Sequence, residues 1–141
     1  MKTIFTILFF VSSFTLIAQS DNVAGVYDFS MGGDDSKFDY KLTLNPDGTF
    51  FFSYYSYIKN GIPPEKKKSA QGKWTVDKNV VTFFSSKQLD ADNKEILDFT
   101  NTKARFITKS PRNKTDQVIK TRLQFLESDI PWMSTIEMFK I

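Results

Sequence analysis

Cysteine and histidine are both absent from the 141 residues of this chain. Without cysteine there is no disulfide, no thiolate nucleophile and no sulfur ligand for a metal. Without histidine, a Ser-His-Asp triad, a His-ligated zinc site and the usual general base near neutral pH are excluded. Catalysis would fall to carboxylates, lysine or tyrosine, and no spacing in the sequence pairs such groups. We therefore expect a protein that is not an enzyme, with no catalytic residue, metal or cofactor.

A strong excess of one charge is also missing, because 19 Lys and Arg face 16 Asp and Glu for a net charge of +3. The charges are expected to be spread along the chain. The only basic run, Lys66, Lys67 and Lys68, is interpreted as part of a solvated loop. This balance predicts neither a nucleic-acid nor a membrane partner.

An apolar run of about 20 residues, the length of a membrane-spanning helix, is missing as well. The one apolar stretch, residues 4–11, follows Lys2 and leads to the small residue Ala18. This order of features is typical of a bacterial secretory signal peptide. We predict that residues 1–18 are a signal peptide cleaved after Ala18 and that residues 19–141 form a single domain, periplasmic or secreted. No cysteine follows the apolar stretch, so a lipoprotein anchor at that point is excluded.

The sequence does have hydrophobic alternation with a period of two, which is typical of strands with one buried face. The alternation is clearest over residues 37–44 and 49–57, on either side of a turn that contains Pro46 and Gly48. A bulged turn of this kind pairs Asn45 with Thr49. It places four pairs on one face: Leu44 with Phe50, Leu42 with Phe52, Tyr40 with Tyr54, and Phe38 with Ser56. A slip of one residue would break this agreement, so the register is strongly specified.

The other face of the same hairpin carries Phe51, Tyr55 and Tyr57, where polar residues are expected. Three aromatic side chains on such a face need a cover, a ligand or a partner. Another strand or the 58–68 loop could supply the cover, and this alternative stays open.

Further strands are predicted from short apolar runs between turn signals, at residues 23–29, 72–76, 80–84, 104–108, 118–125 and 135–141. A tight turn at residues 78–79 would place Trp74, Val76, Val81 and Phe83 on one face. Residues 87–99 are either a long loop or contain a short helix capped by Asp90. About seven or eight short antiparallel strands predict an all-β fold, a single antiparallel β-barrel with at most one short helix.

Three local patterns occur in order: Gly25-Val26-Tyr27, the hairpin with Asp47-Gly48-Thr49-Phe50, and Gly72-Lys73-Trp74. Together they resemble small bacterial envelope proteins of the lipocalin-like type, and they are similar to the barrel domain of the copper-resistance lipoproteins. The chain lacks the lipidated Cys and the Cys-x-x-Cys pair of that family, and it has Tyr27 where lipocalins have Trp. The resemblance implies a lipocalin-like barrel in the cell envelope, without metal sensing.

The aromatic residues of the inner face provide the first functional hypothesis. They either fill the barrel or leave a pocket for one small ligand. The expected lining consists of Tyr40, Phe52, Tyr54 and Trp74. The chain would then be an exported, monomeric binding protein for a small hydrophobic or amphipathic ligand.

The alternative is a non-enzymatic interaction or structural protein with a filled core. In that case Phe51, Tyr55 and Tyr57 would contact another protein of the envelope. A membrane-spanning barrel is disfavoured, because the outward side chains of Lys37, Lys41 and Lys73 would face lipid at about 2 to 4 kcal/mol each near the midplane.

Overall fold

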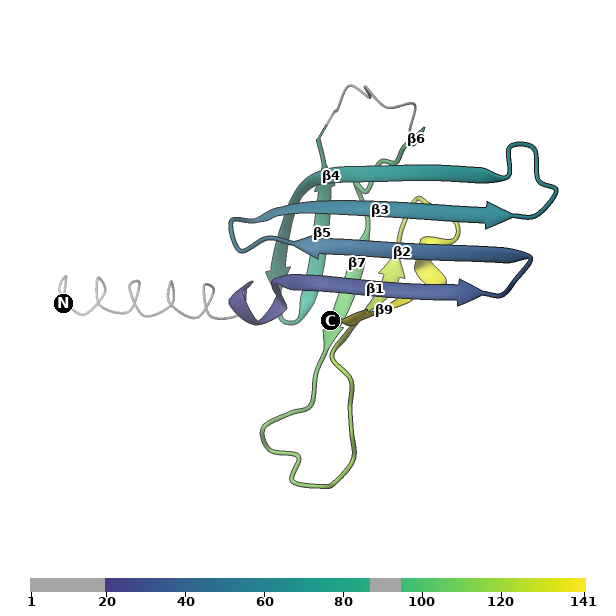
Figure 1. The fold of residues 1–141 in the computed structure, drawn as a ribbon. Coiled ribbons are helices and arrows are strands. Elements are labelled where there is room, and N and C mark those ends of the chain that lie inside the picture. The colour runs from purple at the N-terminus through teal and green to yellow at the C-terminus, as the bar shows by residue number, and fades with distance from the viewer. Residues whose placement is uncertain (1–19, 87–94) are drawn as a thin grey trace, which may run out of the picture.

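Strands make up most of the computed structural model, which describes residues 20–86 and 95–141 (Figure 1). In chain order they are β1 (Gly25–Gly32), β2 (Ser36–Leu44), β3 (Thr49–Ile58), β4 (Glu65–Asp77), β5 (Val80–Ser85), β6 (Glu95–Ile96), β7 (Lys103–Ile107), β8 (Arg122–Glu127) and β9 (Glu137–Lys140). Within the described ranges, helix is confined to one turn at residues 20–23 and to the 3-10 turn η1 (Met133–Thr135). The prediction of an all-β fold is confirmed.

Eight of these strands close into an antiparallel barrel. They are hydrogen-bonded in the order β1-β2-β3-β4-β5-β7-β8-β9, and β9 pairs with β1 to complete the circuit. The ninth strand, β6, lies outside the circuit and pairs in parallel with β4. Closure satisfies the backbone groups that an open sheet leaves free at its edges.

The hairpin of β2 and β3 has the predicted register. The predicted pairs are all present: Leu44 with Phe50, Leu42 with Phe52, Tyr40 with Tyr54, and Phe38 with Ser56. In the turn, the Asn45 N–H donates to the Thr49 carbonyl at 2.9 Å, and the Gly48 N–H donates to the Asn45 carbonyl at 3.1 Å. Gly48 has a φ of +89°, a conformation that glycine adopts without steric cost.

The hairpin of β4 and β5 also follows the prediction. Its cross-strand pairs include Trp74 with Phe83 and Val76 with Val81, so these four side chains share one face. The turn residues Lys78 and Asn79 both have positive φ, as a two-residue type I′ turn requires.

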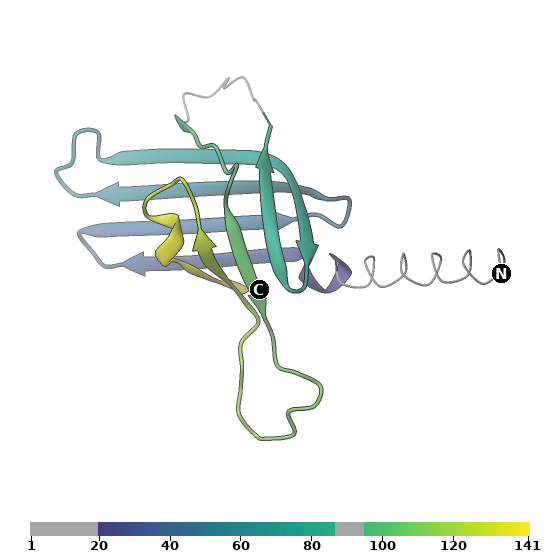
Figure 2. The same ribbon diagram turned by 180° about the vertical axis from the view of Figure 1, so that it is seen from behind.

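Strand β4 belongs to both layers of the barrel because it bends near Gly72. Gly72 pairs with Phe50 in β3 on one side and with Ser85 in β5 on the other. A Cβ atom at Gly72 would lie 1.9 Å from the Phe84 carbonyl oxygen, so glycine permits the close approach of two backbones. Figure 1 shows the long strands β1–β4 in front, and Figure 2, seen from behind, shows β5, β7 and β8 in front of them and crossing them at a steep angle.

Aromatic rings pack between the two layers. The ring of Phe99 lies 4.8 Å from that of Phe52, 5.5 Å from that of Phe50 and 5.7 Å from that of Phe83. Phe125 continues the series, 6.0 Å from Phe83. All five rings are at most 2% exposed, and full burial of such a side chain stabilises a protein by about 1.5–3 kcal/mol.

Tyr27, at the position where lipocalins have Trp, is fully buried on β1. Its hydroxyl donates a hydrogen bond to the Val23 carbonyl, and burial raises the pKa of Tyr27. The tyrosine therefore has a partner for its one polar atom, as a buried hydroxyl requires.

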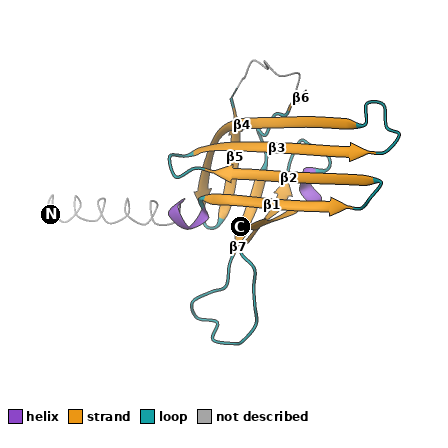
Figure 3. Cartoon of the chain, viewed as in Figure 1, coloured by secondary structure: helices purple, strands orange, loops and turns teal. Residues whose placement is uncertain are grey.

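The strands predicted from residues 23 and 135 begin two residues later, at Gly25 and Glu137, and the strand predicted from residue 118 begins four residues later. The prediction of a strand from residue 118 is wrong, because β8 begins at Arg122 and residues 108–121 form the long loop after β7. Neighbouring β9 pairs with β8 only from Arg122, so β-branched residues 118–119 have no strand to pair with. This loop projects away from the barrel, as the secondary-structure colouring of Figure 3 shows.

The segment after β5 also differs from one of its two predictions. A helix running through Leu97 is wrong, because Glu95 and Ile96 form strand β6 beside Lys68 and Ser69 of β4. The predicted cap, Asp90, and the predicted signal peptide, residues 1–18, lie outside the described residues. Among the described residues, no helix combines the length and apolarity needed to cross a membrane.

Candidate binding site on the outer face of the barrel

Three of the four predicted ligand-lining residues come together inside the barrel. The rings of Tyr40 and Tyr54 lie 5.0 Å apart, and Trp132 lies 5.7 Å from Tyr40, 5.5 Å from Tyr54 and 6.3 Å from Phe52. Phe52 is fully buried, Tyr40 is nearly so, and burial raises the pKa of Tyr40. These rings therefore pack on one another, and only Tyr54 and Trp132 of this group are half-buried.

The fourth predicted residue, Trp74, is held in a different way. Its indole N–H donates to the Asn45 carbonyl at 3.0 Å, at the turn between β2 and β3. It is 4% exposed and packs in the core. The hydrogen bond ties the start of the β4–β5 hairpin to the preceding hairpin, which is a structural role.

A hollow of about 260 Å³ lies on the other side of β3, over β2, β3 and β4. We call it the outer hollow. Its outward-facing lining includes Lys41, Phe51, Ser53, Tyr55, Lys67 and Ser69. Along β3, Ser53 separates the two rings, so Phe51 and Tyr55 lie about 13 Å apart at the usual rise per residue. Ser69 pairs with Ser53, and because both side chains are small, they leave space between the rings of Phe51 and Tyr55.

The structure brings together two of the three predicted partner-binding residues. Phe51 is 44% exposed and Tyr55 is half-buried, and both line the outer hollow. Tyr57 faces the same side but lies one row further along β3, between Lys37 and Glu65 of the neighbouring strands. It does not line the hollow.

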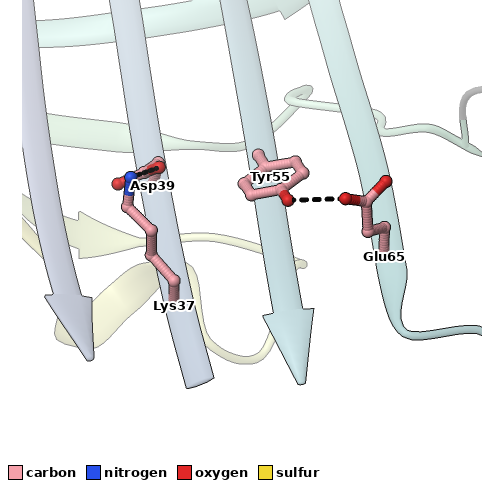
Figure 4. Close-up of polar contacts among 4 residues, drawn as sticks. All are labelled: Lys37, Asp39, Tyr55 and Glu65. Carbon is pink, nitrogen blue, oxygen red and sulfur yellow. Dashed lines mark hydrogen bonds and ion pairs between the residues drawn. The ribbon is translucent and has the colours of Figure 1, made fainter. Parts of the chain in front are cut away.

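Asp39, which lines the outer hollow, and Glu65, which lies beside it, already have partners on this face (Figure 4). Asp39 forms an ion pair with Lys37 at 3.0 Å, and the Tyr55 hydroxyl donates to Glu65 at 3.0 Å. A hydrogen bond from Ser30, together with Lys37, lowers the pKa of Asp39, and the bond to Glu65 raises the pKa of Tyr55.

Three lysines line the outer hollow: Lys68 pairs with Glu95 at 3.3 Å, whereas Lys41 and Lys67 are left without such partners. Neither Lys41 nor Lys67 forms an ion pair or a hydrogen bond with another described residue, although Asp28 lies opposite Lys41 in the register. The charged groups of the hollow that lack a partner among the described residues are therefore cationic, and two aromatic rings form part of its walls.

The sequence did not reveal four members of this site. Lys41, Ser53, Lys67 and Ser69 are ordinary residues for the solvent face of a strand, and they acquire meaning only from the pairing of β3 with β4. The alternation of Phe51 and Tyr55 around Ser53 was visible, and it was the one signal that could have indicated a gap between two rings. Inside the barrel, Phe99 was missed because it stands alone between polar residues.

Comparison with known proteins adds no relative, because no protein-family model, no curated protein and no solved structure matches the chain. The eight-stranded antiparallel barrel agrees with the lipocalin-like expectation at the level of the fold. Within residues 20–86 and 95–141, carboxylates do not gather in groups of three that could hold a metal ion.

Proposed function

We propose that the chain is an exported, non-enzymatic binding protein. Its outer hollow receives one apolar side chain from an acidic segment of a partner protein of the cell envelope. The observation that carries this proposal is the hollow between Phe51 and Tyr55, with Lys41 and Lys67 unpaired beside it. The core behind it supports the same conclusion, because Phe52 on the inner face is fully buried against other rings.

The size of the hollow favours a side chain over a free small molecule. Pockets that enclose drug-sized ligands have volumes of about 300–1,000 Å³, and the outer hollow has about 260 Å³. An aromatic or large aliphatic side chain would contact both rings and rest on the two serines. Aromatic residues are enriched where protein partners bury their surfaces.

The charges favour an acidic neighbourhood around that side chain. Asp39 and Glu65 are already engaged by Lys37 and Tyr55, whereas Lys41 and Lys67 are free to donate hydrogen bonds to carboxylates of a partner. Complementary charges at the rim of an interface increase the association rate and the specificity more than the affinity. We therefore expect binding that weakens with salt.

A defined peptide tests this proposal. The probe is a blocked pentapeptide, Asp-Glu-Trp-Glu-Asp, and its controls replace Trp by Ala or all four acidic residues by Lys. Titration followed by amide chemical shifts should show the Trp peptide binding and the largest shifts at Ser53 and Ser69. The double variant Phe51→Ser, Tyr55→Ser should weaken binding at least about tenfold. Tyr57→Ser, the matched control, should leave it unchanged.

Equal shifts with all three peptides would contradict the proposal, and so would shifts centred away from β3 and β4. Loss of binding in the Tyr57 variant alone would place the contact elsewhere on this face.

A small hydrophobic or amphipathic ligand inside the barrel is a second candidate. It is favoured by one observation: Tyr54 and Trp132 are half-buried at the edge of the ring cluster with Tyr40. Native mass spectrometry of protein purified without detergent would show a discrete added mass of a few hundred daltons. The bare mass alone would contradict this candidate.

Export rests on the sequence of residues 1–18 and is part of the proposal. Amino-terminal sequencing of the protein isolated from its own cells should begin at Gln19. A chain that retains Lys2 would contradict it.

A further inference from the structure

The loop between β7 and β8, with the strand residues that flank it, concentrates the positive charge of the molecule. Residues 103–122 contain seven of the 19 basic residues and one of the 16 acidic residues. The basic residues are Lys103, Arg105, Lys109, Arg112, Lys114, Lys120 and Arg122. The expectation that charge is spread along the chain is therefore wrong for this segment. The long-loop part of it, residues 108–121, extends away from the barrel (Figure 1).

The loop is organised by its own hydrogen bonds. The hydroxyls of Thr108 and Thr121 meet at 3.0 Å and close its base. The Lys109 ammonium donates to the Thr115 carbonyl at 2.7 Å, and the Thr115 N–H donates to the Asn113 side chain at 3.0 Å. The cations are thus presented on a structured loop.

A second hollow, of about 640 Å³, lies where this loop meets β8 and β9. Apolar side chains supply much of its lining, and Lys120 and Arg122 supply two cations. The apolar members are Ile107, Val118, Ile119 and Phe139. Val118 is 86% exposed, which is unusual for a large apolar side chain on a loop rich in charge.

One carboxylate, that of Glu137, lines this hollow, and Asp116 is the one acidic residue of the loop. Glu137 contacts Arg122 through Nε at 3.4 Å, and that Nε makes no hydrogen bond with a described residue. This Nε is buried, so a second acceptor would have to reach the terminal N–H groups of the Arg122 guanidinium. The Lys120 ammonium lies 5.9 Å from the centre of the Phe139 ring, so it remains at the surface of the hollow.

We infer that the basic loop and the second hollow form a docking surface for a membrane rich in anionic lipid. Lys and Arg side chains beside exposed apolar residues match the charged headgroups and the apolar boundary of such a membrane. A nucleic acid shares the anionic chemistry, but bases bind to exposed aromatic rings. The aromatic residue of this hollow, Phe139, lies beneath Lys120, and the exposed apolar residue is the aliphatic Val118. This surface is separate from the outer hollow and does not depend on the function proposed for it.

Flotation with lipid vesicles tests the inference. The full chain is mixed at about 0.15 M salt with vesicles of phosphatidylcholine alone or of phosphatidylcholine and phosphatidylglycerol in equal amounts. Each basic residue near an anionic surface changes the partition about fivefold. The variant with Arg112, Lys114 and Lys120 all changed to Gln should lose on the order of a hundredfold in partition to the anionic vesicles. Val118→Ser should lose about threefold or more on both kinds of vesicle.

The matched control changes Lys59, Lys66 and Lys73 to Gln, which alters the net charge equally at exposed positions on and beside strands β3 and β4. It should bind as the natural chain does. The apolar residues 4–11 are present in every variant, so their own affinity for lipid cancels in the comparison.

Three outcomes would overturn the inference. Equal losses in the two triple variants would make the effect one of net charge. Equal binding to neutral and anionic vesicles would show that the loop cations do not contribute to binding. A loss of binding to a 20-nucleotide single-stranded DNA in the loop variant, with vesicle binding unchanged, would assign the surface to nucleic acid.

Discussion

The two faces of β3 carry the same kind of side chain and put it to different use. On the inner face, Phe50 and Phe52 are at most 2% exposed and pack against Phe99 from beyond β6. On the outer face, Phe51 is 44% exposed and has Thr43 and Gln71 as its cross-strand partners. Alternation along one strand therefore does not decide what an aromatic residue does.

The residues packed around an aromatic ring decide whether it stabilises the fold or stays available for binding. Inner rings gain partners from the second layer of the barrel, so their burial stabilises the fold. Outer rings are flanked by polar side chains of the neighbouring strands, and their apolar surface stays available to another molecule. The lesson is that an aromatic residue on the solvent face of a barrel becomes a candidate for binding when small residues separate it from the next ring.

The sharpest way to break this comparison is to remove one ring from each face. Phe52→Ala should lower the free energy of unfolding by about 3–5 kcal/mol, because it leaves a cavity among packed rings. Phe51→Ala should lower it by less than about 1 kcal/mol, since the ring is half in solvent already. Urea unfolding followed by tryptophan fluorescence measures both. Similar losses in the two variants would show that the outer ring is part of the folded core.

The second largest effect is expected at the corner that separates the two layers. Gly72→Ala places a Cβ atom 1.9 Å from the Phe84 carbonyl oxygen, so the backbones of β4 and β5 must move apart. We expect a loss of about 1–3 kcal/mol in the free energy of unfolding. Gly33→Ala is the control, because a Cβ atom there meets nothing within 4 Å. A stable Gly72 variant would mean that the bend does not need glycine.

The sequence was sufficient to predict the strand pairs within hairpins, but it did not predict contacts between residues far apart along the chain. The turn at Gly48 and the alternation around it predicted every pair of the β2–β3 hairpin, because register in a tight hairpin follows from the turn and the buried face. Contacts of Phe99 and Trp132 with this hairpin come from irregular segments that carry no periodicity. Their placement depends on closure of the barrel, which the sequence predicts as a fold but not as a set of contacts.

The same reasoning applies to the two binding surfaces. Phe51, Tyr55 and Tyr57 were predicted as an outer patch, and the structure shows that the first two share a hollow. Residues 118–121 were predicted as the start of a strand that runs to residue 125, and this hid the length of the basic loop. Strand propensity reflects packing in a pleated sheet, and no neighbouring strand continues alongside these residues.

A smaller effect is expected from the hydroxyl at the edge of the outer hollow. Tyr55→Phe removes the hydrogen bond to Glu65 but keeps the ring. Because both side chains lie at the surface, the free energy of unfolding should change by no more than about 0.5 kcal/mol. Binding of the acidic Trp peptide should be retained or slightly weakened, since Glu65 then gains freedom to repel it. Loss of binding as complete as in the Phe51→Ser, Tyr55→Ser variant would show that the hydroxyl, and not the ring, makes the contact.

The smallest effect is expected on the pKa values of two neighbouring residues of β2, Asp39 on the outer face and Tyr40 on the inner face. Asp39 points outward, and its hydrogen bond from Ser30 and its ion pair with Lys37 hold its pKa below the usual 3.8. Tyr40 points inward, and burial raises its pKa above the usual 10.0. The carboxylate therefore contributes stability that is present above about pH 4 and is lost as the pH falls through its lowered pKa.

Titration of both side chains by NMR should show the two opposite shifts. Ser30→Ala should move the pKa of Asp39 back toward 3.8 more than Lys37→Gln does, because the Ser30 bond is the larger cause. An Asp39 with an ordinary pKa would mean that its contacts with Ser30 and Lys37 are weak. Asp39 could then pair with Lys41 and compete with an acidic partner for that lysine.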